Sequence, residues 1–347
     1  MDKKFKIGFV TSQFGNITRG GAEVQMEKTM QYLNLIGAFE VELLDYNTRD
    51  LGKYDLVHFF KSNPEFEFLV DKLKQLNVPY VVSSVYFPTR YFYEVILFKW
   101  FDKLLPRFVN SWMFRNQMLK LWRNAEMIFP NTDEEALFLR RCGVRNRIEI
   151  IPNGLDKDEM VSISPEIFFV KYPHLKGKKF VLNVGRIDAR KNQKRLVEAC
   201  KELNVAVVII GAIWEQEYYN KILDLGYTEV YFLGPIFDKQ LLYSAFNACE
   251  IFCLPSTLET PGIVALEAAY YNKPIVITSV GGTRWYFGDL AKYVDWKSVS
   301  EIKLAIAFYL NPANKPMGLN ERVQNYFWDN IARQYKALYQ EILSVKK

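Results

Sequence analysis

The feature that most constrains the fold is a series of short apolar runs that alternate with helix-length segments. The runs have the length and composition of strands buried on both faces of a sheet. They recur at residues 6–10, 41–44, 56–60, 80–85, 125–130, 180–184, 205–210, 230–233, 251–254 and 274–279. Segments such as residues 64–76 separate them and have helical length. This alternation predicts a doubly wound α/β fold with parallel sheets.

Length, charge and cysteine usage narrow the class of protein. A chain of 347 residues is longer than one typical domain and suits two cores. It has no run of about 18 uncharged apolar residues and enters a strand almost at once, so we expect no transmembrane span and no signal peptide. The four cysteines lack metal-ligand spacing and indicate reduced thiols of a cytoplasmic protein. The net charge of +6 favours an anionic partner, which a nucleic acid, a nucleotide or an anionic membrane would satisfy.

Residues 251–273 carry the most specific chemistry. The apolar run 251–254 is followed by a break at Pro255 and then, after Pro261 and Gly262, by a helical pattern. The first amides of such a helix, those of Gly262, Ile263 and Val264, have no intrahelical partner and can hold a phosphate group. The sequence therefore predicts an anion site at this helix start.

Two carboxylates flank the predicted anion site. Glu259 precedes the helix, and Glu267 lies five residues after Gly262, about 7 Å further along at ~1.5 Å per residue. Carboxylates accept hydrogen bonds strongly, so this layout suits a diphosphate with hydroxyl-bearing groups on either side. The alternative is a buried strand-helix unit in which an N-terminal Glu is favoured only by the helix dipole.

The residues around these carboxylates resemble a known signature. Glu259-Thr260-Pro261-Gly262 and Leu266-Glu267-Ala268, spaced as they are here, resemble the motif of the family-four glycosyltransferases, which are retaining enzymes of the GT-B fold. The resemblance implies that Glu259 contacts the donor sugar and that Glu267 contacts the ribose hydroxyls. Pro261 stands where the family commonly has Phe.

The same resemblance implies the domain organisation. A GT-B chain has two Rossmann-like domains that face a central cleft, and here they would comprise residues 1–155 and 156–323. Residues 148–156 match the family string that marks the crossing between the domains. Residues 324–347 would return to pack on the N-terminal domain.

Two cations follow the strand at residues 180–184. Gly185 ends that strand, and Arg186 and Lys191 come five residues apart in the loop after it. Arg can bind a diphosphate with two parallel hydrogen bonds, and Lys adds a point charge. Basic loop residues are often merely solvated, but these match the diphosphate-binding pair of the family. We therefore assign Arg186 and Lys191 to catalysis, because fixed cations stabilise the charge that develops on a departing nucleoside diphosphate. Glu259 is assigned to catalysis as well, because the resemblance implies that it contacts the donor sugar.

The N-terminal half offers weaker candidates. Gly20 and Gly21 follow the first strand and match the family loop that faces the donor diphosphate. His58 ends a strand and is interpreted either as an acceptor contact or as a hydrogen-bonded core residue. Relatives place a sugar-contacting histidine within the region matching residues 80–86, where this chain has none and where Ser84 or Tyr86 would take its place. Phe232 lies in the second half, where relatives contact the base.

Residues 86–123 are rich in aromatic and basic side chains. The aromatic residues are Tyr86, Tyr91, Phe92, Tyr93, Phe98, Trp100, Phe101, Phe108, Trp112, Phe114 and Trp122, and the basic ones are Arg90, Lys99, Lys103, Arg107, Arg115, Lys120 and Arg123. Such a segment is typical of helices that lie in the headgroup region of an anionic membrane. Packing on the protein core is the alternative. Single-stranded nucleic acid would select a similar composition, but the segment lies in no recognisable nucleic-acid module, so we expect no nucleic acid partner.

These features together predict a glycosyltransferase that uses a nucleoside diphosphate sugar as donor. The resemblance implies a retaining, hexose-transferring enzyme, and the aromatic segment suggests a lipid-linked or glycan acceptor at the inner face of the membrane, as in cell-surface polysaccharide assembly. We expect no cofactor and no metal, because Asp156-Lys157-Asp158 follows a turn, where Asp commonly serves turn chemistry. The alternatives are a GT-B-like phosphorylase, a sugar-nucleotide epimerase or a non-catalytic membrane-binding scaffold.

Overall fold

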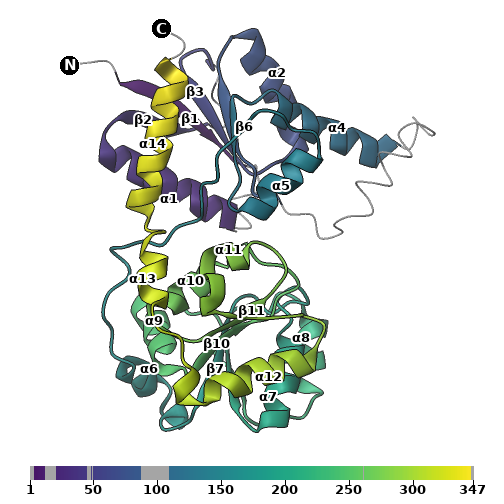
Figure 1. The fold of residues 1–347 in the computed structure, drawn as a ribbon, viewed down its shortest axis with the longest axis vertical. Helices are drawn as coiled ribbons and strands as arrows, with labels where there is room; N and C mark the ends of the chain where they lie inside the picture. Colours follow the sequence, from purple (N-terminus) through teal and green to yellow (C-terminus); the bar gives the residue numbers. More distant parts are fainter. Residues whose placement is uncertain are drawn as a thin grey trace. The chain divides into compact units, whose positions relative to one another are not determined.

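The computed structural model describes residues 4–11, 21–44, 48, 50–86, 109–260 and 262–344, with the backbone alone described at 109–115. The chain forms two compact units (Figure 1). One comprises Met1–Gly154 with Trp328–Lys347, and the other comprises Leu155–Phe327. The chain leaves the first unit one residue before the predicted boundary and returns to it at Trp328 rather than at residue 324.

The N-terminal unit is built on a six-stranded parallel sheet in the order β2-β1-β3-β4-β5-β6. Its strands are β1 Phe5–Val10, β2 Phe39–Leu43, β3 Leu56–Phe60, β4 Tyr80–Ser83, β5 Met127–Phe129 and β6 Arg147–Ile148. Its described helices are α1 Gly21–Ile36, the short 3-10 turn Pro64–Phe66, α2 Glu67–Gln75, α4 Val109–Arg123, α5 Asp133–Arg141 and α14 Trp328–Ser344. Of residues 148–156, the string that matches the domain crossing of the family, only Ile148 lies in a regular strand, β6, and most of the string is loop.

The C-terminal unit repeats this plan with the strand order β12-β11-β10-β7-β8-β9, again parallel. Its strands are β7 Phe180–Val184, β8 Ala206–Ile210, β9 Val230–Phe232, β10 Ile251–Leu254, β11 Ile275–Thr278 and β12 Lys292–Val294. Its helices are α6 Glu166–Lys171, α7 Gln193–Leu203, α8 Gln216–Leu223, α9 Lys239–Ala248, α10 Ile263–Tyr270, α11 Thr283–Phe287, α12 Val299–Leu310 and α13 Leu319–Gln324. Short 3-10 turns occupy Pro173–Leu175, Gly288–Leu290 and Pro312–Asn314.

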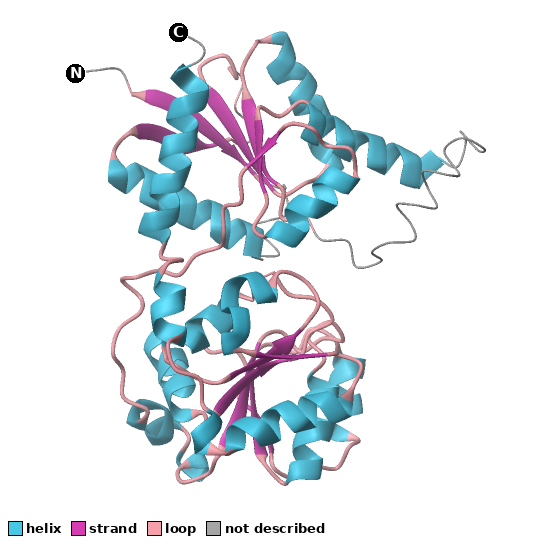
Figure 2. Ribbon diagram, in the orientation of Figure 1, coloured by secondary structure: helices cyan, strands magenta, loops and turns pink. Residues whose placement is uncertain are grey.

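Both sheets are covered by helices on their two faces, as Figure 2 shows with the strands in magenta and the helices in cyan. In β7, Phe180 and Leu182 pack with residues of α6, α9 and α10, whereas Val181 between them packs with residues of α7 and α12. Alternate residues of a strand point to opposite faces, so a strand buried on both sides must be apolar throughout. This is why the continuous apolar runs predicted the doubly wound architecture, which the structure confirms.

The last helix belongs to the N-terminal unit, as the family resemblance implied. Helix α14 lies beside α1 (Figure 1), and Trp328, Ile331 and Tyr335 on it are buried among residues of β1, β3 and β5. Apolar positions recurring at three- and four-residue intervals give this helix a single buried face. The C-terminal segment therefore supplies part of the N-terminal core.

Candidate active site

A buried ion pair lies at the carboxyl edge of the C-terminal sheet. Lys191, in the loop after β7, places its Nζ 2.6 Å from Oε1 of Glu259, in the loop after β10. Both side chains are about nine-tenths buried. Burial alone would raise the pKa of Glu259, but the charges of Lys191 and Arg190 outweigh it and hold that pKa below its usual value. Glu259 is therefore a fixed, ionised carboxylate.

The backbone of Glu259 is held by the loop after β11. Its N–H donates to the carbonyl of Val280 (3.2 Å), and its carbonyl accepts from the N–H of Gly282 (3.1 Å). Gly281 lies between these two bonds with a φ of +100°, and a Cβ there would stand 2.1 Å from the Glu259 carbonyl oxygen. Only glycine fits this position, so the Gly281-Gly282 pair supports the backbone that carries the Glu259 carboxylate.

The loop after β7 is hydrogen-bonded to the segment that leads to Glu259. The N–H of Thr257 donates to the carbonyl of Arg190 (2.8 Å), and the side-chain amide of Asn192 donates to the carbonyl of Pro255 (2.9 Å). A guanidinium nitrogen of Arg190 lies 3.4 Å from the Leu258 carbonyl oxygen. Arg190 is thus a second cation near Glu259, and sequence reasoning missed it although it adjoins Lys191.

Helix α10 begins where the sequence placed an anion site. Gly262 is its N-cap with a φ of +74°, and a Cβ there would lie 2.9 Å from Cδ2 of Leu254. Ile263 and Val264 form the first turn, so their amides precede any intrahelical carbonyl partner. Thr260, half-buried, lies in the loop just before this turn, and Pro261 falls outside the described residues.

Glu267 follows on α10 and has a different environment from Glu259. It is 6% exposed, and its nearest cation, Lys239 Nζ at the start of α9, is 3.8 Å away and also contacts Glu159 at 3.2 Å. Burial raises the pKa of Glu267 to about 7 because Lys239 only partly offsets it and Glu159 adds a like charge. This carboxyl group therefore titrates near neutral pH.

Arg186 is the exposed member of the predicted pair. Its Nε lies 3.7 Å from Oδ2 of Asp188, and about half of its side chain is open to solvent. Gly185 before it is half-buried, and a Cβ there would meet the Lys191 side chain at 3.3 Å. The structure thus brings Gly185 and Lys191 into contact and places Arg186 at the same edge of the sheet.

Phe232 and His58, two further predicted contacts, differ in how deeply they are buried. Phe232 is half-buried on β9, and its ring lies edge-on to Tyr219 of α8 (4.8 Å), so the base contact stays a prediction. His58 is fully buried, with Ser83 Oγ 2.9 Å from Nε2 and Tyr339 Oη 2.5 Å from Nδ1. Burial lowers the pKa of His58 well below its usual value, so this neutral core residue contradicts an acceptor contact.

Other N-terminal candidates are only partly visible. Gly21 is exposed at the first position of α1, whereas Gly20 falls outside the described residues. Ser84 is buried and donates to Oε1 of Glu135 (2.6 Å), and the Tyr86 ring packs on Trp122 (5.5 Å between centroids). Of the two residues proposed to replace the histidine of relatives, Ser84 is therefore held in the interior of the unit, and Tyr86 is half-buried against it.

The C-terminal end of the aromatic and basic segment packs on the N-terminal unit. Trp122 is buried and donates its indole N–H to Ser62 Oγ (2.8 Å), and Lys120 pairs with Asp71 (2.7 Å) and Glu67 (3.1 Å). Trp122 therefore packs in the core, and Lys120 is held by two carboxylates of the same unit. Residues 87–108 lie outside the described part of the chain.

Metal and membrane features can be checked only where the structure is described. Within those residues, no group of three or more His, Cys, Asp and Glu side chains could hold a metal ion. Asp156 serves turn chemistry, since its Oδ1 accepts from the N–H of Asp158 (3.0 Å). None of the described helices is long and apolar enough to cross a bilayer.

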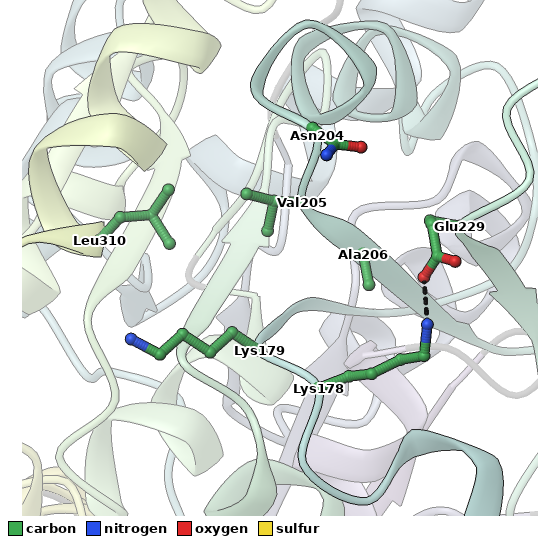
Figure 3. Close-up of a pocket in the computed structure, with 7 residues that line it drawn as sticks. All are labelled: Lys178, Lys179, Asn204, Val205, Ala206, Glu229 and Leu310. Carbon is green, nitrogen blue, oxygen red and sulfur yellow. Dashed lines mark hydrogen bonds and ion pairs between the residues drawn. The ribbon is translucent and has the colours of Figure 1, made fainter.

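A depression of about 580 Å³ lies at the opposite, amino edge of the C-terminal sheet (Figure 3). Its lining residues are Lys178, Lys179, Asn204, Val205, Ala206, Glu229 and Leu310. Lys178 is neutralised there by Glu229 at 2.7 Å. Doubly wound folds bind ligands at the carboxyl ends of their strands, so we assign the ligand site to the edge with Glu259.

Comparison with known proteins identifies the family that the C-terminal unit resembles. Residues 165–326, nearly all of the C-terminal unit, match the family model described as "Glycosyl transferases group 1". The chain is 27% identical over 323 residues to N-acetylgalactosamine-N,N'-diacetylbacillosaminyl-diphospho-undecaprenol 4-alpha-N-acetylgalactosaminyltransferase of Campylobacter jejuni, covering 82% of this chain and 84% of that one. Three other relatives, 26% to 30% identical, are matched over only 54% to 62% of their length.

Solved structures share the whole architecture. Sucrose-phosphate synthase from Thermosynechococcus elongatus superposes with a TM-score of 0.79 at 18% identity, covering 99% of this chain and 100% of that one. Anabaena HepE in complex with UDP-glucose superposes with a TM-score of 0.74 at 18% identity, covering 97% and 99%. The two Rossmann-like units define a GT-B fold. The C-terminal unit matches the group 1 glycosyltransferases along nearly all of its length.

Proposed function

We propose that this protein transfers a hexose-type sugar from a nucleoside diphosphate sugar to an acceptor hydroxyl with retention of configuration. The observation that carries the proposal is the buried Lys191–Glu259 pair beside the start of α10. Burying a charged side chain costs free energy, which an ion pair only partly offsets. Buried carboxylates with shifted pKa values cluster at functional sites. The HepE complex with UDP-glucose supports a nucleotide-sugar donor for this fold.

Each group has a distinct role in this proposal. Arg186, Lys191 and the first amides of α10 hold the diphosphate and stabilise the negative charge that grows on it as the glycosidic bond breaks. Glu259 accepts hydrogen bonds from the sugar hydroxyls, and Glu267 accepts them from the ribose. The leaving phosphate then helps to deprotonate the acceptor hydroxyl on the same face of the sugar, which retains the configuration.

A donor screen tests the proposal. We expect one of the UDP-, GDP-, ADP- or dTDP-sugars at 100 times its Kd to stabilise the protein by about 2.7 kcal/mol, or roughly 5–10 °C in melting temperature. That donor should then be hydrolysed or transferred equally well with and without EDTA, because we propose transfer without a metal. A strict requirement for inorganic phosphate would instead indicate a phosphorylase, and conversion of the sugar without an acceptor would indicate an epimerase.

We further propose a lipid-linked acceptor at the inner face of the membrane. The Campylobacter relative, whose name includes diphospho-undecaprenol, supports this acceptor class. The aromatic and basic residues of the segment 87–115 support contact with an anionic bilayer. The test is sedimentation with phosphatidylglycerol vesicles, in which a variant with Lys99, Trp100, Phe101 and Lys103 all changed to Ser should pellet less. Equal pelleting of the two proteins would contradict membrane contact.

A further inference from the structure

Arg186 lies against an exposed tryptophan that follows the neighbouring strand. The guanidinium carbon of Arg186 is 4.6 Å from the centroid of the Trp214 ring, within the range of a cation–π contact. Trp214 is 57% exposed, so packing of the core does not explain its position. A large aromatic side chain left in solvent beside a proposed ligand-binding cation invites a functional explanation.

The backbone fixes the two residues relative to each other. The N–H of Ile187 donates to the carbonyl of Ala212 (2.8 Å), and the N–H of Trp214 donates back to the carbonyl of Ile187 (3.1 Å). The loops also approach closely at Gly211, where a Cβ would stand 2.0 Å from the Gly185 carbonyl oxygen. Backbone hydrogen bonds thus hold the loop after β8 against the loop after β7, and they fix the position of the Trp214 backbone relative to Arg186.

Asp188 completes the surroundings of the guanidinium. Its Oδ2 lies 3.7 Å from Nε of Arg186, while its Oδ1 accepts from the backbone N–H of Lys191 (2.9 Å), so this carboxylate is itself held in place. The Asp188 contact is to Nε, whereas the terminal nitrogens form the fork that binds phosphate oxygens in pairs. An exposed Arg without such neighbours would sample many rotamers and lose that freedom on binding.

We propose that Trp214 is a positioning residue for Arg186, whose guanidinium it holds ready for the donor diphosphate. This inference rests on the function proposed above. The sequence alone did not single out Trp214, because its partner lies 28 positions earlier in the chain and is reached only through the pairing of two loops.

The test is calorimetric titration of the full chain with inorganic pyrophosphate and, separately, with UDP. Trp214→Ala and Trp214→Leu should each weaken pyrophosphate binding about three- to tenfold, as expected for loss of a solvent-exposed cation–π contact and of preorganisation. Trp214→Phe keeps an aromatic face and should stay within about twofold of the wild type. Trp296→Ala is the matched control, because it removes a second arginine–tryptophan contact (Arg195, 5.6 Å) outside the proposed diphosphate contacts.

A double-mutant cycle separates positioning from direct contact. In an Arg186→Ala background, Trp214→Ala should weaken pyrophosphate binding by less than about twofold. An equal loss in both backgrounds, no loss in either, or a loss confined to UDP would overturn the inference while leaving the proposed function standing. Failure of the wild type to bind either pyrophosphate or UDP would overturn the proposed function and this inference together.

Discussion

The carboxyl edges of the two sheets use their polar residues in opposite ways. In the C-terminal unit, the charged residues lie in loops: Lys191 pairs with Glu259 in a buried ion pair, and the exposed Arg186 lies beside Asp188. In the N-terminal unit, His58, Ser83 and Glu135 are buried, and their partners come from the interior of the unit.

The difference teaches what each edge contributes. Two tyrosines of α14 contact this edge: Tyr335 lies 3.0 Å from Ser83, and Tyr339 lies 2.5 Å from His58. The polar groups of the N-terminal edge therefore bind the last helix. The C-terminal edge keeps ionised groups whose hydrogen-bonding capacity a ligand can still use. Substitutions in the C-terminal unit should therefore affect donor binding and turnover, and those in the N-terminal network should affect stability.

The largest effect is expected from Glu259→Gln. The change keeps the volume but removes the charge, so it leaves Lys191 buried without an anionic partner and withdraws the carboxylate from the donor sugar. We expect kcat/KM to fall by about 10²–10³-fold or more, measured with the donor found by screening.

Glu250→Gln is the matched control for this substitution. It removes a carboxylate of the same unit that pairs with Lys315 at 2.8 Å, at the amino end of β10. This variant should keep its activity, because the pair lies away from the carboxyl edge. Near wild-type kcat/KM in Glu259→Gln would contradict the assignment of the active site.

A smaller loss is expected from Gly281→Ala. The added Cβ would stand 2.1 Å from the Glu259 carbonyl oxygen, so the loop after β11 must shift and the carboxylate shifts with it. We expect kcat/KM to fall about 10–100-fold, since misplacement of about 1 Å can cost that much. Gly226→Ala, at another positive φ but with open space around it, is the control. Equal activities of the two variants would show that Gly281 does not support Glu259.

Donor affinity should change about tenfold with pH through Glu267. Its pKa of about 7 means that the carboxyl group is mostly protonated at pH 6 and mostly ionised at pH 8, and only the ionised form accepts two hydroxyl hydrogen bonds. Titration of UDP between pH 6 and 8 should therefore show tighter binding at high pH in the wild type. Glu267→Gln should remove this dependence, and a dependence that persists in that variant would belong to another group.

The stability of the protein without donor should fall as pH rises, whereas donor affinity should increase. The native state holds the Glu267 proton up to about pH 7, whereas the unfolded chain releases it near 4.5. The free energy of unfolding should thus fall as pH rises from 4.5 through 7, by up to about 3 kcal/mol from this group. Urea titrations at both pH values check this, and Glu267→Gln should flatten the change.

The smallest functional effect is expected from Tyr339→Phe in the N-terminal network. The substitution removes the hydroxyl group that meets Nδ1 of His58 and leaves that buried nitrogen unpaired. We expect about 1–2 kcal/mol of destabilisation by urea unfolding, with pyrophosphate affinity unchanged. Tyr227→Phe, which removes a half-buried hydroxyl bound to the Val205 carbonyl (3.1 Å), should cost less. A loss of pyrophosphate binding in Tyr339→Phe would contradict the claim that the N-terminal network affects stability and not donor binding.

By itself the sequence determined the doubly wound architecture and the segments that carry the chemistry. Apolar runs such as 180–184 must be buried on both faces, and the break before Ile263 marks a helix start, because both signals are local. Family resemblance added the pairing of Glu259 with Glu267 as donor contacts, and the structure places both on the segment after β10.

Only the tertiary structure decided which residues meet. Gly281 supports Glu259, Trp214 lies against Arg186, and His58 is drawn into the core by a tyrosine 281 positions later. No periodicity or spacing encodes these contacts, since they arise where loops from neighbouring strands meet and where α14 packs on β3. The physical reason is that burial and charge pairing depend on distance through space, which the order of residues fixes only after the whole chain has packed.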